Sequence, residues 1–113
     1  MESILTSIKK MLGITEEYTH FDPDIIMHIN SVFMTLNQLG VGPEKGFYIE
    51  DETTTWFEYI NDLKQLQAVK SYMGLKVRLL FDPPANSTIM QAMKDSINEF
   101  EFRLNIAVDP IKT

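Results

Sequence analysis

Apolar positions recur at helical spacing along most of the chain, and the longest such run is residues 63–84, LKQLQAVKSYMGLKVRLLFDPP. The run stops at Asp82-Pro83-Pro84, which predicts a helix over residues 63–81. Two neighbouring stripes follow it, one made of Leu66, Val69, Met73, Val77 and Leu80 and the other of Ala68, Tyr72, Leu75 and Leu79. A helix that is apolar over so much of its circumference needs neighbours on more than one side. In a chain of 113 residues we expect one flank to meet another subunit, so assembly is the first functional hypothesis.

The clearest helix start lies at residues 22–24. Asp22 is expected to cap, Pro23 to take the first helical position, and Asp24 to favour the positive end of the helix dipole. Gly40 is expected to stop this helix. One face is then lined by apolar residues at helical spacing: Ile25, Ile29, Val32, Phe33 and Leu36.

Three further helices are weaker in the sequence. A first helix is expected over residues 2–12, with Gly13 ending it. A short aromatic helix over residues 53–61 would be capped by Thr54 or Thr55, and Glu58 stands where a capping box places its acid. After the prolines, Asn86 or Ser87 would cap a last helix that ends near residue 106. Its apolar positions follow a 3-4-3-4 spacing typical of a bundle core: Met90, Met93, Ile97, Phe100 and Leu104.

Two local features carry their own expectations. Gly74 stands in the middle of the longest helix, where glycine costs about 1 kcal/mol relative to alanine, so we expect a close helix crossing there. Residues 40–53 read as a loop with turn signals at Gly42-Pro43. Its Phe47 and Tyr48 suit a contact with another protein, or Phe47 and Ile49 fold into the core.

The elements together predict an all-α fold. Three main helices and one or two short ones would form a small helical bundle with short connections. The length suits one domain, taken as residues 1–106, with a C-terminal tail over residues 107–113. No stretch resembles a signal peptide or a membrane span.

Charge is spread unevenly along a chain whose formal net charge is −6. Residues 62–81 are basic, whereas the segments before and after them are acidic. An acidic chain is a poor general binder of DNA phosphates. Lys64, Lys70, Lys76 and Arg78 either pair with acids of a neighbouring copy or solvate one helix face.

The sequence offers little for catalysis. There is no cysteine, which excludes thiolate chemistry and disulfides. Glu17 and His20 have the Glu-x-x-His spacing of di-iron bundles, but no second such motif accompanies them. Asp24 and His28 form an ordinary helix-surface pair. We therefore expect no metal, no cofactor and no enzyme activity, and no nucleotide-binding or hydrolase motif is present. A metal-dependent enzyme at Glu17, His20 and His28 is the least favoured alternative.

Several segments in order resemble the head–tail connector (adaptor, or head-completion) proteins of long-tailed bacteriophages. They are ILTSIKKMLGI, FDPDIIMHINSVFMTLNQLGVGPEKGFYIED, TTWFEYI, VKSYMGLKVRLLFDPPANSTIMQAM and EFEFRLN. The likeness covers residues 4–105, and residues 72–84 and 101–105 are its most specific parts. It implies a structural protein without catalytic residues. Such proteins form a ring, typically of twelve copies, beneath the portal protein, extend the DNA channel and seat a stopper or tail protein in the virion neck.

Two sets of residues are expected to make these contacts, in the virion and in the host cytoplasm during assembly. Candidates for the subunit interface lie on the basic helix: Lys70, Tyr72, Gly74, Lys76 and Arg78. Candidates for axial partners lie in the loop and the tail: Phe47, Tyr48, Asp109, Pro110 and Ile111. Double-stranded DNA would pass through the ring without sequence-specific binding. The competing hypothesis is a small regulatory or DNA-associated helical interaction protein.

Overall fold

In the computed structural model, which describes residues 2–108, five helices pack into one bundle. They are α1 (Ile4–Met11), α2 (Asp22–Gln38), α3 (Trp56–Tyr59), α4 (Leu63–Phe81) and α5 (Ser87–Val108). Within the described residues the only β-type pairing is a single antiparallel bridge between Ser3 and Thr55. The predicted all-α bundle is confirmed.

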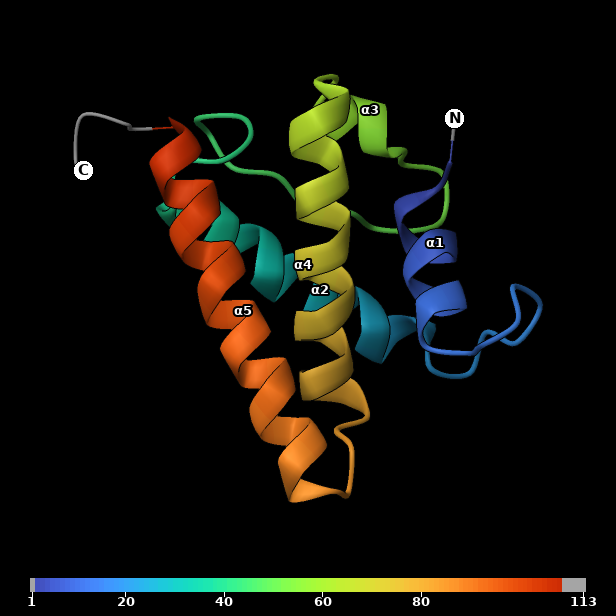
Figure 1. The fold of residues 1–113 in the computed structure, drawn as a ribbon. Coiled ribbons are helices and arrows are strands. Elements are labelled where there is room, and N and C mark those ends of the chain that lie inside the picture. Colours follow the sequence, from blue (N-terminus) through green and yellow to red (C-terminus); the bar gives the residue numbers. More distant parts are fainter. Residues whose placement is uncertain (1, 109–113) are drawn as a thin grey trace.

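Helix α4 is the centre of the bundle. Figure 1 shows α5 alongside it, α1 on its other flank and α2 crossing behind it, and α4 packs against all three. The core residues of α4 are accordingly buried on several sides: Leu66, Val69, Tyr72, Met73, Gly74 and Val77. The predicted need for neighbours around this helix is met within one chain.

Two of the predicted helix starts are confirmed by their hydrogen bonds. The side chain of Asn86 accepts from the backbone N–H groups of Thr88 and Ile89, at 2.8 and 3.1 Å, and so caps α5. The Glu58 carboxylate accepts from the backbone N–H of Thr55 at 2.7 Å. Helix α3 is nevertheless only four residues long, because the backbone at Ile60 is already extended.

The expected N-cap at Asp22 is wrong. Asp22 is the first residue of α2, Pro23 is the second, and Phe21 holds the capping position without a side-chain bond. The Asp22 carboxylate instead faces the ammonium of Lys9 on α1, with 2.9 Å between Nζ and Oδ1. This approach lacks hydrogen-bond alignment at Oδ1, so the contact is a Coulombic one. The carboxylate therefore contacts Lys9, a residue of another helix, instead of capping the backbone of α2. The residues around Asp22 in the sequence give no sign of this contact.

Lys9 ties the connector after α1 to the bundle. Its ammonium donates to the backbone carbonyls of Glu16 and Tyr18, at 3.0 and 2.8 Å, in addition to facing Asp22. The Lys9 side chain is 3% exposed. Two carbonyls accept hydrogen bonds from the buried ammonium and the Asp22 carboxylate balances its charge, and such pairing lowers the cost of burying a lysine.

Trp56 joins α3 to α1 in the same core. Its indole N–H donates to the Ser7 hydroxyl at 2.7 Å, and that hydroxyl donates to the carbonyl of Ile4 at 3.0 Å. Both Trp56 and Ser7 are buried. The bridge between Ser3 and Thr55 lies beside them, so the N-terminus and α3 are fixed as a unit.

Gly74 lies at a close approach, as expected, but a side chain rather than a helix backbone fills the space. A Cβ at Gly74 would stand 2.5 Å from the sulfur of Met11.

Helix α5 extends to Val108, two residues beyond the predicted end. Of the residues proposed for axial contacts, Asp109, Pro110 and Ile111 lie outside the described part of the chain.

Candidate functional site

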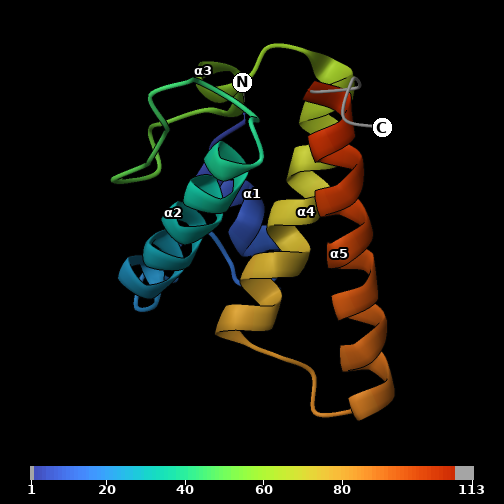
Figure 2. The ribbon, with the colours of Figure 1, turned by 90° about the vertical axis from the view of Figure 1, so that its left-hand side faces the viewer.

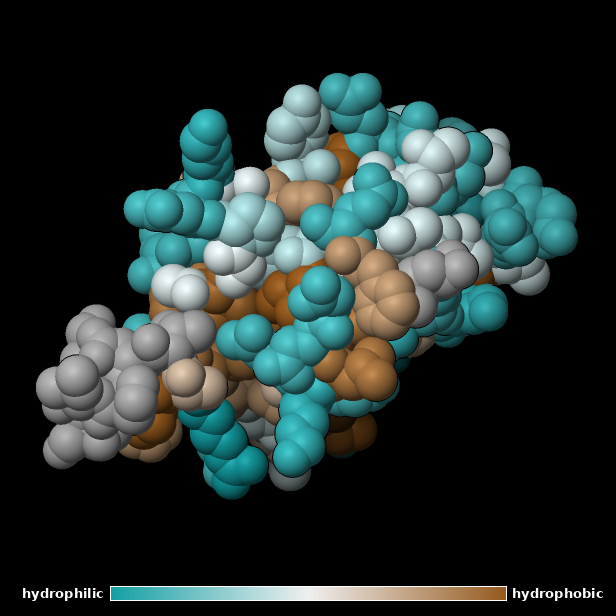
Figure 3. All heavy atoms as spheres, turned by 90° about the horizontal axis from the view of Figure 1, so that it is seen from above, coloured by the Kyte–Doolittle hydropathy of each residue, from teal (hydrophilic) through white to brown (hydrophobic). Residues whose placement is uncertain are grey.

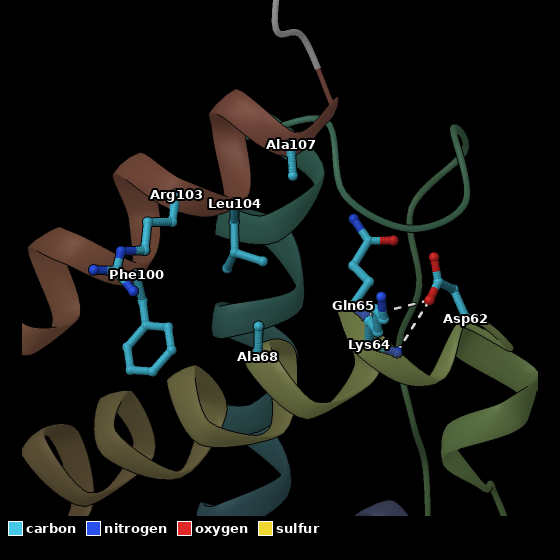
Figure 4. Close-up of a pocket in the computed structure, with 8 residues that line it drawn as sticks. All are labelled: Asp62, Lys64, Gln65, Ala68, Phe100, Arg103, Leu104 and Ala107. Carbon is cyan, nitrogen blue, oxygen red and sulfur yellow. Dashed lines mark hydrogen bonds between the residues drawn. The ribbon is translucent and has the colours of Figure 1, made fainter.

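One surface hollow is an apolar groove between the beginning of α4 and the C-terminal half of α5. Figure 4 shows the side chains of Phe100 and Leu104 reaching from α5 toward Ala68 on α4. The groove has a volume of about 490 Å³. Its floor is apolar and its rim is polar, the rim being formed by Asp62, Lys64, Gln65 and Arg103.

The sequence shapes this groove through small residues and a cap. Ala68 and Ala107 leave open space where larger side chains would close the gap between the helices. Asp62 caps the start of α4, because its carboxylate accepts from the N–H groups of Lys64 and Gln65 at 3.0 and 3.4 Å. Figure 3 looks down on this end of the molecule, where hydrophobic side chains gather in the middle and hydrophilic ones surround them.

Two cations stand on the rim of the groove. Arg103 pairs with Glu99 at 2.6 Å, and both side chains are largely exposed. Exposed pairs of this kind contribute only about 0–1 kcal/mol, so Arg103 can exchange its partner easily. Lys64 forms no ion pair within residues 2–108. The groove therefore suits an apolar surface that is bordered by acids.

The other basic side chains of α4 contact groups of their own chain, two of them carboxylates and one a backbone carbonyl. The ammonium of Lys70 lies 2.8 Å from Glu2, and that of Lys76 lies 3.4 Å from Glu101. Arg78 donates from Nε to the carbonyl of Asp82 at 3.0 Å. The sequence left open whether these cations meet a neighbour's acids or water, and internal pairing is a third outcome.

The five residues predicted for the subunit interface are placed differently within the protomer. Tyr72 and Gly74 are buried, and Tyr72 donates to Glu101 at 2.7 Å. Lys70 and Lys76 are partly buried in their ion pairs, whereas Arg78 is exposed. Their role between subunits stays a prediction, and Arg78 is the member most open to a partner.

Burial separates the four tyrosines into two pairs. Burial raises the pKa of Tyr59 far above the usual value of about 10. Burial raises the pKa of Tyr72 likewise, and the hydrogen bond to Glu101 and the charge of that carboxylate add to the shift. Tyr18 and Tyr48 are exposed.

We expect Tyr59 and Tyr72 to contribute phenolate absorbance only on unfolding, because the pKa of each is raised in the folded protein. When the pKa is higher in the folded state, the contribution to stability is complete below the unfolded pKa. It is lost as the pH rises from the unfolded pKa to the folded pKa. Stability should therefore fall above about pH 10. A spectrophotometric titration followed with circular dichroism checks this, and ionisation of Tyr59 and Tyr72 near pH 10 in protein that is still folded would contradict it.

The residues considered for a metal site do not converge. Residues 2–108 contain no group of three or more His, Asp or Glu side chains able to hold a metal ion together. His20 and His28 belong instead to an aromatic cluster. His20 contacts the ring of Phe21 at 4.9 Å between centroids, and His28 faces Phe81 at 6.3 Å.

Sequence reasoning missed a clamp on the loop after α2. Asn30, on α2, donates to the carbonyl of Ile49 at 3.0 Å and accepts from its N–H at 2.8 Å. The side-chain amide thus acts as a strand partner for Ile49, which is buried. Phe47 is half-buried against Phe33 and Tyr59, at ring distances of 5.1 Å for each. Tyr48 lies between Phe47 and Ile49 in the sequence, and its side chain is exposed.

Within residues 2–108 the bundle thus presents an apolar groove and several exposed apolar side chains, whereas most of the cations of α4 are engaged within the chain. The sequence matches the family of phage connector proteins over residues 4–110, which is most of the chain. The chain therefore belongs to the phage connector family, a family of structural phage proteins, and the resemblance noted in the sequence is confirmed. No curated protein and no solved structure matches the chain. Within residues 2–108, none of the helices combines the length and apolar character needed to cross a membrane.

Proposed function

We propose that the protein is a ring-forming adaptor in the neck of a phage virion, between the portal and the stopper or tail protein, and that it extends the DNA channel. The observation that carries the proposal is membership of the connector family over residues 4–110. The exposed groove between α4 and α5 supports it, because a subunit in a ring needs surfaces left open after folding. The ring would assemble in the host cytoplasm and remain in the virion.

The charge of the chain fits a conduit for DNA. Each copy carries a formal charge of −6, so a ring of twelve copies would carry twelve times that charge. Phosphates bind to clustered Lys and Arg, and an acidic lumen would let the duplex pass without adhering to the wall. Three of the cations in α4 are already engaged with acids or a carbonyl of the same chain, which leaves fewer of them for phosphates.

Light scattering of the purified protein with the phage's own portal protein tests this function. We expect a complex that contains many adaptor copies for each portal assembly, even where the isolated adaptor is a monomer. An adaptor that stays monomeric and ignores the portal would contradict the proposal. DNA binding gives the complementary measurement: we expect weak binding at low salt, whereas tight binding that falls steeply with salt would favour a DNA-associated protein.

A further inference from the structure

Three of the most exposed large apolar side chains lie around one residue of α2. Met27 and Met34 are 58% and 66% exposed, and because they are seven residues apart they lie on the same helix face. Asn30 lies between them in the sequence and clamps Ile49, the neighbour of Tyr48. Tyr48 is itself 66% exposed. We call Met27, Met34 and Tyr48 the α2 patch.

The α2 patch and the groove are built on different elements of the protomer, the patch on α2 and the loop after it and the groove on α4 and α5. Figure 2 shows α2 and the loop that follows it on one side, α5 on the other, and α4 between them. The two surfaces are also different, one a ridge of protruding side chains and the other a hollow. Contact between two different surfaces of identical chains is heterologous, and such contacts close into rings when the rotation allows.

The charges at the edges of the two surfaces are complementary. Beyond Tyr48 the loop carries three exposed acids in succession, Glu50, Asp51 and Glu52. The groove carries Lys64, without an ion pair within residues 2–108, and Arg103, held only by an exposed pair. The groove suits a partner that has an apolar ridge with acids at its border. This chain has such a ridge in the α2 patch, which the acids after Tyr48 border.

We propose that the groove of one copy receives the α2 patch of the next copy, as the lateral contact of a ring. This inference rests on the proposed function. Methionine side chains are flexible and adapt to an irregular floor such as that formed by Phe100 and Leu104. Tyr48 then belongs to the lateral contact rather than to an axial one, and Lys64 faces the acids that follow Tyr48.

The absence of cysteine in the chain gives a direct test. One preparation carries Met34→Cys and the other carries Ala107→Cys at the edge of the groove. The two are mixed in equal amounts, assembled with portal protein and treated with a short bis-maleimide. We expect a cross-linked dimer in the mixture, and little or none when either variant is treated alone.

The matched control replaces Ala107→Cys with Phe102→Cys. Phe102 is 65% exposed, close to the 66% of Met34, and a separation of two residues places it on the face of α5 opposite to Leu104. We expect no cross-link between Met34→Cys and Phe102→Cys. Equal cross-linking in both mixtures would overturn the inference, as would strong cross-linking of Met34→Cys with itself.

Charge reversal gives a second, independent readout. Lys64→Glu should lower the amount of assembled ring several-fold, and Asp51→Lys in the same chain should restore part of it. Light scattering distinguishes a failure of the lateral contact from a failure of the proposed function. Normal rings without the Met34–Ala107 cross-link would overturn the lateral contact alone, whereas no assembly of the unmodified chain with portal would overturn the proposed function as well.

Discussion

Replacing Lys9 by alanine should lower the free energy of unfolding by about 3 kcal/mol, because breaking one side of a buried ion pair leaves the other charge without a partner. The Asp22 side chain is only 20% exposed, so water cannot fully solvate the carboxylate that remains. The carbonyls of Glu16 and Tyr18 would lose a donor at the same time. Thermal unfolding followed by circular dichroism measures the effect, which we expect to lower Tm by about 10 °C.

Lys10 provides the matched control for this substitution. It is the next residue of α1 and is exposed. Lys10→Ala removes the same charge and the same number of atoms, and surface substitutions of this kind stay within about 0.5 kcal/mol. Equal losses from Lys9→Ala and Lys10→Ala would show that net charge, rather than the buried contacts of Lys9, sets the stability.

Replacing Trp56 by alanine should be at least as damaging, with a loss of about 3–5 kcal/mol. The indole is completely buried, and its removal opens a large cavity between α1 and α3. Ser7 would also lose the donor that now lies 2.7 Å from its hydroxyl. A domain with about 5–15 kcal/mol of total stability has little left after such a loss, so urea unfolding should begin at a much lower concentration.

Phe57 is the control for Trp56. It is the next aromatic residue of α3, and it is exposed. Phe57→Ala should cost less than about 1 kcal/mol, since a surface position leaves no cavity behind. If Trp56→Ala and Phe57→Ala unfolded at the same urea concentration, the packing of Trp56 would not anchor α3 and the N-terminus as described.

The sequence predicts those features that depend on near neighbours in the chain. Helix α4 has the expected bounds because its apolar stripes and the prolines after it act locally. The Asn86 cap and the pair of Thr55 and Glu58 follow from spacings of two or three residues. Such signals require no knowledge of the tertiary structure.

The sequence does not predict which residues far apart in the chain contact each other in the fold. Lys70 pairs with Glu2 and Lys76 with Glu101, across 68 and 25 residues of sequence, and no pattern in either segment selects the other. Asp22 was expected to cap because capping is the local use of an aspartate, but the ammonium of Lys9 competes for it in the folded chain. The groove depends on how α4 and α5 pack, although the small residues Ala68 and Ala107 were visible signals of it.

The coverage of α4 by α1, α2 and α5 has a consequence for the timing of assembly. A chain whose central helix is already enclosed completes folding alone, so its Tm should not depend on protein concentration, as it does in obligate oligomers. Folding and ring closure are then separate events. If the proposed function holds, finished subunits would accumulate during an infection, and the appearance of the portal, rather than the rate of folding, would set the moment at which the neck is built.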